Sequence, residues 1–361
     1  MPRAIEFSIA RPPLHNMGKS FPKLHNAMWS GLVGKGPALE PFIDLDTLLD
    51  LTAKAEVDGK RFDGVDLFLV NPHISIDLDS DGVSRLAEKL NSRGFVAGSV
   101  VAPVWPTVGG GSSMGDQEER QKFLGQLRKA CRIARDLRQA DVRPYGIVRI
   151  DSAVDPATWA EDPEGSKKIA ATFREACSIA EDHGERLAAE GEVSCGGMHS
   201  WRRMVDLLEM VGRPEVLGFQ ADMADTLLYA LGYNSPEDAL LPPDYEWKSE
   251  KPLIQALRQM TQVLRPWTID FHVAQSDATV RDAGPQMKIG RHCLPDDPSA
   301  KLKIPHDTGY WLRDDDGAVT KAFQHICWDG STLSNAVLLN QDTWNRILAS
   351  MLSVRSAHGW A

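Results

Sequence analysis

The sequence lacks the features that mark membrane and secreted proteins. No run of about eighteen consecutive apolar residues, the length that crosses a bilayer, occurs in its 361 residues. The opening residues, MPRAIEFSIARPP, lack the long apolar segment of a secretory signal peptide. The five cysteines are scattered and form no C-x-x-C pair, which argues against a disulfide framework and a cysteine-rich zinc site. We therefore expect a cytoplasmic protein without a membrane partner.

Basic charge is also scarce. The chain has 40 Lys and Arg residues against 50 Asp and Glu residues, a net charge of −10. A protein that binds the phosphate backbone needs a basic face, so nucleic acid is not an expected partner. The content of 42% hydrophobic and 25% charged residues is ordinary for a globular protein, and the length allows one large domain or two smaller ones.

Short apolar runs alternate with segments of helical periodicity along most of the chain. Eight such units at this length predict parallel strands joined by helices, an α/β fold of the (β/α)8 TIM barrel type. An open doubly wound sheet with a second domain is the alternative, but no G-x-G-x-x-G motif follows the first run. The predicted strands are residues 4–10, 64–72, 95–105, 145–153, 186–192, 216–224, 268–277 and 323–330. The predicted helices are residues 41–56, 81–94, 118–140, 166–184, 200–212, 252–264 and 340–359.

Two long segments interrupt the alternation. Residues 12–41 follow the first predicted strand, and residues 278–319 follow the seventh. Both would emerge at the C-terminal rim of the barrel, where such barrels build their active sites, and loops of this length are uncommon without a function. We expect one barrel domain over residues 1–361 with these two insertions at its rim.

Polar side chains end four successive predicted strands: Glu190, Asp222, His272 and Asp329. An aspartate after a strand is commonly a helix cap, and a lone histidine in a strand is commonly structural. The ordered recurrence on four strands instead favours a metal site, because three converging carboxylates would repel one another without a cation. Oxygen ligands with one imidazole favour Mn²⁺, and Mg²⁺, Co²⁺, Fe²⁺ or Zn²⁺ would also fit.

Four further residues are candidates for substrate binding. Arg149 and Asp151 share a face at the end of the fourth predicted strand, where they could bind substrate oxygens or form a buried ion pair. Glu192 lies at strand spacing from Glu190, and we expect it to contact substrate. Trp105 could stack on a sugar face or anchor its own loop.

Three histidines are candidates for general acid–base catalysis. His73 and His199 stand at predicted strand ends, and His325 precedes Asp329 on the same face of the eighth strand, at a deeper position. An imidazole close to a metal is a natural acid or base. Each of the three could instead be structural, and the sequence predicts that one of them acts.

The order Glu, Asp, His and an acidic residue at strands five to eight resembles the xylose-isomerase-like barrel family of sugar isomerases, epimerases and inositol-pathway enzymes. LAAEGE resembles its strand-five motif, with Glu190 at the metal-ligand position and Glu192 in place of a histidine. ADMAD resembles its strand-six motif, with Asp222 as ligand and Asp225 in place of a histidine. The resemblance spans roughly residues 60–335. It implies that Glu190 and Asp329 flank a sugar and exchange protons with it.

The segments HCLPDDPSAKLKIPHDTGYWLRD and QHICWDG resemble the large subunits of bacterial C-glycoside deglycosidases. This resemblance implies a lyase that cleaves 3-oxo-glycosides through an enolate and releases the aglycone, paired with a small β-sandwich subunit. A metal-dependent sugar isomerase or epimerase, which also forms an enolate, is the alternative. Apurinic endonucleases share the barrel but need more histidines and a basic groove. A non-catalytic partner subunit is the remaining alternative.

Overall fold

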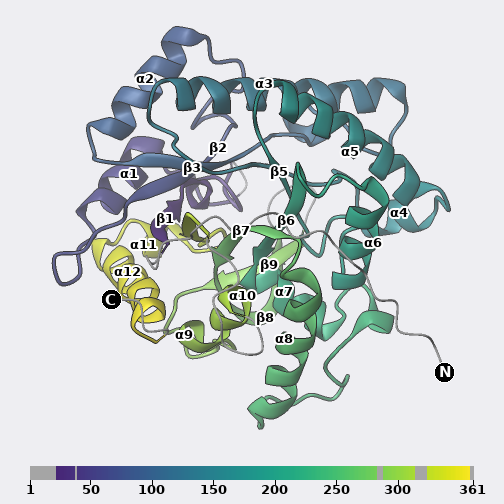
Figure 1. Ribbon diagram of the computed structural model, residues 1–361. Coiled ribbons are helices and arrows are strands. Elements are labelled where there is room, and N and C mark those ends of the chain that lie inside the picture. The colour runs from purple at the N-terminus through teal and green to yellow at the C-terminus, as the bar shows by residue number, and fades with distance from the viewer. Residues whose placement is uncertain (1–21, 37–38, 283–287, 314–322, 358–361) are drawn as a thin grey trace.

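The strands close into a barrel, as the sequence predicts. The computed structural model describes residues 22–36, 39–282, 288–313 and 323–357. Eight parallel strands follow one another around the barrel in the order β1-β10-β7-β6-β5-β4-β3-β2 (Figure 1). They are β1 Lys23–Ala27, β2 Gly64–Phe68, β3 Val96–Val101, β4 Val148–Ile150, β5 Leu187–Glu190, β6 Leu217–Asp222, β7 Thr268–Val273 and β10 His325–Trp328. All of them except β1 lie within predicted strands.

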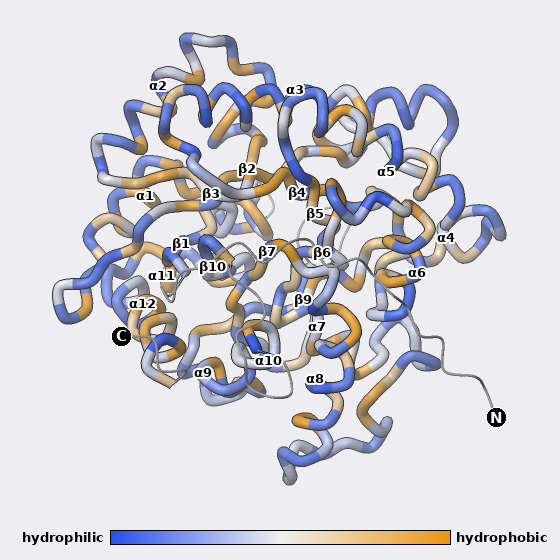
Figure 2. Tube along the Cα trace, in the orientation of Figure 1, coloured by the Kyte–Doolittle hydropathy of each residue, from blue (hydrophilic) through white to orange (hydrophobic). Residues whose placement is uncertain are grey.

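Helices surround the barrel (Figure 1). They are α1 Leu45–Lys54, α2 Ser80–Asn91, α3 Gln117–Gln139, α4 Pro156–Ala160, α5 Gly165–Asp182, α6 Trp201–Val211, α7 Met223–Leu231, α8 Glu250–Leu264, α9 Ile304–Asp307, α10 Gly309–Leu312, α11 Asn335–Leu338 and α12 Gln341–Ala357. Figure 2 shows apolar colour along the central strands and alternating polar and apolar colour along the outer helices. Within the described ranges, no helix is both long enough and apolar enough to span a bilayer.

Helix α2 illustrates why the sequence folds this way. The Asp79 side chain caps its first turn by accepting a hydrogen bond of 2.8 Å from the Gly82 amide. Val83, Leu86 and Leu90 follow at helical spacing and are buried, so one face of the helix packs toward the barrel. The same combination of an aspartate cap and an apolar face begins α3 at Asp116.

The first barrel strand is not where the sequence predicts it. The predicted strand 4–10 lies outside the described residues, and β1 occupies Lys23–Ala27, inside the predicted insertion 12–41. The prediction that residues 12–41 form a loop at the rim is therefore wrong for β1, which pairs in parallel with both β10 and β2 and closes the barrel. The strand KLHNA carries His25 and Asn26 toward buried polar partners, so it lacks the apolar pattern of an ordinary core strand.

The second predicted insertion carries a β-hairpin at the barrel mouth. Strands β8 (Gln275–Asp282) and β9 (Lys288–Cys293) pair antiparallel, with Ser276 opposite His292. The predicted strand 268–277 thus joins the end of β7 to the start of β8. The hairpin contacts α7, so β9 lies beside the carboxyl end of β6.

Candidate metal centre at the barrel mouth

The four predicted metal ligands come together at one end of the barrel. Glu190 and Asp222 end β5 and β6, His272 lies opposite Asp222 in the β6–β7 register, and Asp329 directly follows β10. Nδ1 of His272 lies 3.4 Å from Oε1 of Glu190, 3.6 Å from Oδ2 of Asp329 and 3.9 Å from Oδ2 of Asp222. All four side chains are buried.

A fifth donor, His292, reaches the same cluster from the β8–β9 hairpin. Its Nε2 lies 3.5 Å from Oδ2 of Asp222 and 3.8 Å from Oδ1 of Asp329. The sequence reasoning missed this residue because it belongs to an insertion rather than to a barrel strand. The available signal was its position in GRHCLPDD, inside a long segment expected at the rim.

Asp222 serves two neighbours at once. Its Oδ1 accepts hydrogen bonds of 2.7 Å from the Ala224 amide and 3.1 Å from the Asp225 amide, and so caps α7. Its other oxygen faces the imidazoles of His272 and His292. The helix-cap interpretation and the ligand interpretation of this aspartate are therefore compatible.

Asp329 is held from both sides. Its Oδ1 accepts a hydrogen bond of 2.8 Å from the Ser331 amide, and its Oδ2 accepts one of 2.9 Å from the indole N–H of Trp29. The Trp29 ring also lies against His272, with 5.3 Å between ring centroids. These contacts fix the Asp329 carboxylate in one orientation.

Arg149 joins the carboxylates beside the cluster. Its Nη2 lies 2.6 Å from Oε2 of Glu190, 2.8 Å from Oε1 of Glu192 and 3.7 Å from Oδ2 of Asp151. The guanidinium carbon is 5.5 Å from the Trp105 ring centroid. The buried ion pair weighed from the sequence is thus present, with Glu190 and Glu192 as the nearer partners. The substrate-binding roles of these residues stay predictions.

The carboxyl groups at the mouth differ in acidity. Burial opposes ionisation of Glu190, but Arg149 and His272 hold its pKa below the ordinary value. Burial raises the pKa of Glu192 to about 7, despite the attraction of Arg149. Burial and the Asp222 charge raise the pKa of Asp225 well above its ordinary value. The mouth therefore combines ionised carboxylates with carboxyl groups that hold a proton more tightly.

The pKa values of the two imidazoles reflect the excess of negative charge around them. Burial alone would lower the pKa of His272, but the carboxylates of Glu190 and Asp329 raise it to about 10. Burial alone would also lower the pKa of His292, but the carboxylates of Asp329 and Asp222 raise it to about 10. A cation in this position would stabilise the same carboxylates without the two protons.

The donor geometry fits a divalent cation. Nδ1 of His272 is buried and has no hydrogen-bond partner among the described residues. Its separations of 3.4 to 3.9 Å from three carboxylate oxygens exceed an ordinary hydrogen bond. Ligands bound at about 2.1 Å to one ion lie about 3.0–3.5 Å apart, so a small contraction would suit coordination. Buried carboxylate and imidazole donors of this kind suit Mn²⁺, Mg²⁺, Co²⁺ or Zn²⁺.

A small cavity of about 30 Å³ opens beside these donors. Its polar lining comes from both the cluster and the neighbouring acids, and Phe68, Val101 and Ile289 add apolar surface. The polar lining residues are Arg149, Glu190, Glu192, Asp225, His292, Asp329 and Ser331. Glu192 and Asp225 therefore face the same space as the candidate metal ligands.

The structure does not bring the three predicted acid–base histidines to this cavity. His73 donates a hydrogen bond of 2.6 Å from Nε2 to the Ile43 carbonyl. His199 packs against Trp159, with ring centroids 5.1 Å apart. His325 lies in the barrel interior, where its Nε2 is 3.1 Å from Oδ2 of Asp66. Their catalytic roles stay predictions without a contact at the cavity to support them.

Comparisons with known proteins agree with this architecture. Among curated protein sequences, none matches the chain. A magnesium-bound xylose isomerase-like TIM barrel protein from Mycobacterium smegmatis is 15% identical, with a TM-score of 0.57 over 94% of this chain and 98% of the other. A 3-keto-D-glucoside 4-epimerase from E. coli is 12% identical, with a TM-score of 0.53 over 93% and 100%. A D-psicose 3-epimerase solved in the presence of D-fructose is 12% identical, with a TM-score of 0.56 over 92% and 99%.

Identities this low show a shared fold and leave activity open. The family assignment rests on a sequence match to the family described as xylose isomerase-like TIM barrel, which spans residues 53–297. That range contains six of the barrel strands, β2 to β7, together with Glu190, Asp222, His272 and His292. The chain therefore belongs to the xylose isomerase-like TIM barrel family.

Proposed function

We propose that this protein is a divalent-metal-dependent enzyme that isomerises or epimerises a keto sugar through an enolate. The observation that carries the proposal is the meeting of three carboxylates and two imidazoles at the barrel mouth, beside a cavity. Two proteins of the same fold are described as a D-psicose 3-epimerase and a 3-keto-D-glucoside 4-epimerase, which supports a keto sugar as the substrate class.

The proposed metal ligands are Glu190, Asp222, His272 and Asp329, with His292 as a fifth. We favour Mn²⁺ for this donor set, with Mg²⁺, Co²⁺ or Zn²⁺ as the other fitting ions. When bound, the cation would act as a Lewis acid toward the carbonyl oxygen of the sugar. The protein side chains then have to remove and return a proton.

We assign that proton transfer to Glu192 and Asp225, which both line the cavity. Arg149 holds one oxygen of Glu192, and the Gly290 amide donates a hydrogen bond of 3.2 Å to Oδ1 of Asp225. One carboxylate removes a proton from the carbon next to the carbonyl, which leaves the enolate. The other returns a proton to the opposite face of the same carbon for epimerisation. For isomerisation it protonates the former carbonyl carbon, while the hydroxyl proton of the neighbouring carbon moves to the former carbonyl oxygen.

This assignment differs from the family pattern, in which the ligands corresponding to Glu190 and Asp329 exchange protons. Both oxygens of Asp329 already accept hydrogen bonds, from Trp29 and from Ser331. Proton exchange at Asp329 would require at least one of these bonds to break. Glu192 and Asp225 occupy the positions of the family histidines. The second oxygen of Glu192 accepts only a long hydrogen bond of 3.4 Å from the Ser194 hydroxyl, which is easier to break than the bonds to Asp329.

A lyase that acts on 3-oxo-glycosides is the second proposal. The segment that resembles C-glycoside deglycosidases places His292 at the metal cluster, which supports a role for that segment in the reaction. Removal of the C2 proton beside the C3 ketone would give the same enolate. Collapse of the enolate would expel the aglycone from C1. An aglycone linked through carbon would take up a proton as it leaves. A small β-sandwich partner subunit belongs to this second proposal.

One incubation in D₂O separates the two reactions. Manganese-loaded protein is mixed with D-fructose, D-psicose or a 3-oxo-glucoside, and the products are followed by NMR and chromatography. An isomerase or epimerase incorporates deuterium next to the carbonyl and leaves the glycoside intact. A lyase releases the aglycone. Absence of both outcomes with every substrate would contradict the enolate chemistry, provided that the protein has bound manganese.

A further inference from the structure

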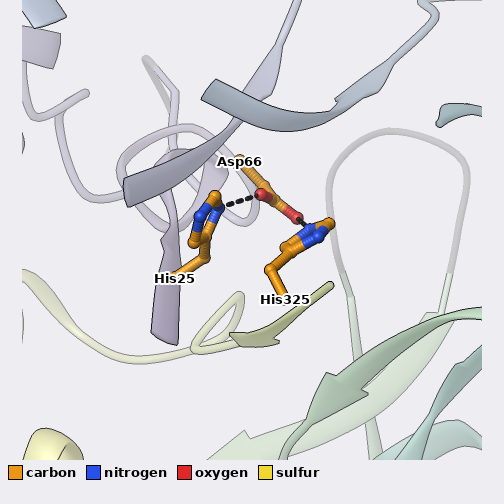
Figure 3. A group of neighbouring side chains, drawn as sticks. All are labelled: His25, Asp66 and His325. Atoms are coloured by element: carbon orange, nitrogen blue, oxygen red, sulfur yellow. Dashed lines mark hydrogen bonds and ion pairs between the residues drawn. The ribbon is translucent and has the colours of Figure 1, made fainter. Parts of the chain in front are cut away.

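A second cluster of potential ligands lies deeper in the barrel, directly below the mouth site, where a ring nitrogen of His272 is within 4.8 Å of an Asp66 oxygen. His25 on β1, Asp66 on β2 and His325 on β10 point toward one another (Figure 3). Nδ1 of His25 is 2.8 Å from Oδ1 of Asp66, and Nε2 of His325 is 3.1 Å from Oδ2 of the same carboxylate. The side chains are 0%, 0% and 4% exposed. His325 precedes Asp329 by four residues, about 13 Å along an extended strand.

The three donors pack closely against a glycine, Gly98 on β3. A Cβ added to Gly98 on β3 would lie 2.4 Å from Oδ1 of Asp66, 2.7 Å from Nδ1 of His25 and 2.8 Å from Nε2 of His325. Zinc binds nitrogen and oxygen ligands at about 2.0–2.2 Å, which places two ligands of one ion about 3.0–3.5 Å apart. The 2.8 Å contact between His25 and Asp66 would therefore have to widen by a few tenths of an ångström for both to coordinate. Three donors from three strands thus meet against the Gly98 backbone, and a side chain at position 98 would push them apart.

The surroundings hold the imidazoles in the orientation that a metal needs. Nε2 of His25 lies 3.0 Å from the Tyr145 hydroxyl, so this nitrogen can carry the ring proton once Nδ1 exchanges its hydrogen bond with Asp66 for the ion. The Tyr145 ring stacks on His325 with centroids 5.2 Å apart. Oδ1 of Asp270 lies 3.7 Å from Nε2 of His325 and is a fourth donor within reach.

We propose that His25, Asp66 and His325 hold a second divalent cation, with zinc as the preferred ion. Two imidazoles and a carboxylate are donors that bind zinc, and Asp270 as a fourth ligand would close the site. Strand β1 pairs with both β10 and β2, so the ion would link the three strands at the closure of the barrel. Its role would be to stabilise the contact between the two ends of the chain rather than to take part in the reaction.

The test uses full-length protein in which the mouth site carries no imidazole, His272→Asn/His292→Asn. The variant is purified from zinc-supplemented cells and dialysed under native conditions against a chelator. We expect about one zinc per chain to remain by mass spectrometry, because the interior site exchanges metal only when the barrel opens. X-ray absorption at the zinc edge should show imidazole scattering, which in this variant cannot come from the mouth site.

Two further variants address the interior site directly. Gly98→Ala in the same background pushes the three donors apart and should remove the zinc, whereas Gly125→Ala, where an added Cβ meets nothing within 4 Å, should retain it. His325→Gln should also remove the zinc and lower the unfolding midpoint. A folded His272→Asn/His292→Asn protein without zinc would overturn the proposal and leave a hydrogen-bonded His–Asp–His group. That outcome would leave the proposed function untouched, because it concerns the mouth site.

Discussion

Nε2 of His292 lies 3.5 Å from Oδ2 of Asp222, although the two residues are 70 positions apart in the chain. Asp222 ends a barrel strand, and His292 belongs to a hairpin that folds over the barrel mouth. The contact makes the hairpin part of the candidate metal centre rather than a cover over it. The mouth site therefore combines donors from the barrel with a donor from an insertion.

Replacement of His292 tests this relationship. His292→Ala should weaken Mn²⁺ binding by about 100-fold, because one donor and its packing around Asp222 are lost together. Isothermal titration of chelator-treated protein measures the change. His306→Ala is the matched control, since His306 lies in the same segment with its side chain 54% exposed. Equal affinity in both variants would show that His292 is not a ligand.

Arg149 should stabilise the mouth site through its charge. Arg149→Met leaves Glu190, Glu192 and Asp151 without their shared cation, and we expect the free energy of unfolding to fall by about 3–5 kcal/mol in metal-free protein. Urea denaturation followed by circular dichroism measures this loss. Arg149→Lys retains the charge and should lose less stability. A loss below about 1 kcal/mol in the methionine variant would mean that the ion pairs contribute little.

Substitution of Glu192 or Asp225 should impair proton transfer and leave metal binding intact. Glu192→Gln and Asp225→Asn should reduce turnover, and with it deuterium incorporation, by about 10²–10⁴-fold, the usual contribution of a general acid or base. Metal affinity should change little in both. Glu118→Gln on the exposed face of α3 is a control for the loss of one carboxylate. If metal affinity falls in parallel with turnover, the two acids act as ligands instead.

Metal affinity should rise with pH. The carboxylates around His272 and His292 raise the pKa of each imidazole to about 10, so both carry protons at neutral pH in metal-free protein. A cation must displace these protons, and each displaced proton should lower the apparent affinity about tenfold for each pH unit of acidification. Titrations between pH 6 and 8, in buffers of different ionisation enthalpy, measure the slope and the protons released. An affinity independent of pH would be incompatible with imidazole ligation.

The sequence predicted the barrel well where the strands are apolar and poorly where they are not. Strands β2 to β7 are short apolar runs between helices, and the alternation alone locates them. Strand β1 escaped notice because His25 and Asn26 bond to partners inside the molecule. Helix α7 was also missed, since every residue from Met223 to Ala230 is buried and no polar face marks the helix.

The candidate site shows the same division. Parallel strands bring their carboxyl ends to one rim, so strand order sufficed to group Glu190, Asp222, His272 and Asp329. His292 could not be placed, because the path of an insertion depends on contacts that no local pattern encodes. The partners of Glu192 could not be predicted either, because its ion pair with Arg149 depends on how β4 and β5 align.

The central claim is that a divalent cation binds at the barrel mouth. Anomalous diffraction at the manganese edge, from crystals soaked in Mn²⁺, locates the ion directly. The account predicts a peak among Nδ1 of His272 and the carboxylates of Glu190, Asp222 and Asp329, and its loss in the Glu190→Gln/Asp329→Asn variant. A saturating soak that leaves this position without a peak, in crystals with an ordered barrel mouth, would contradict it.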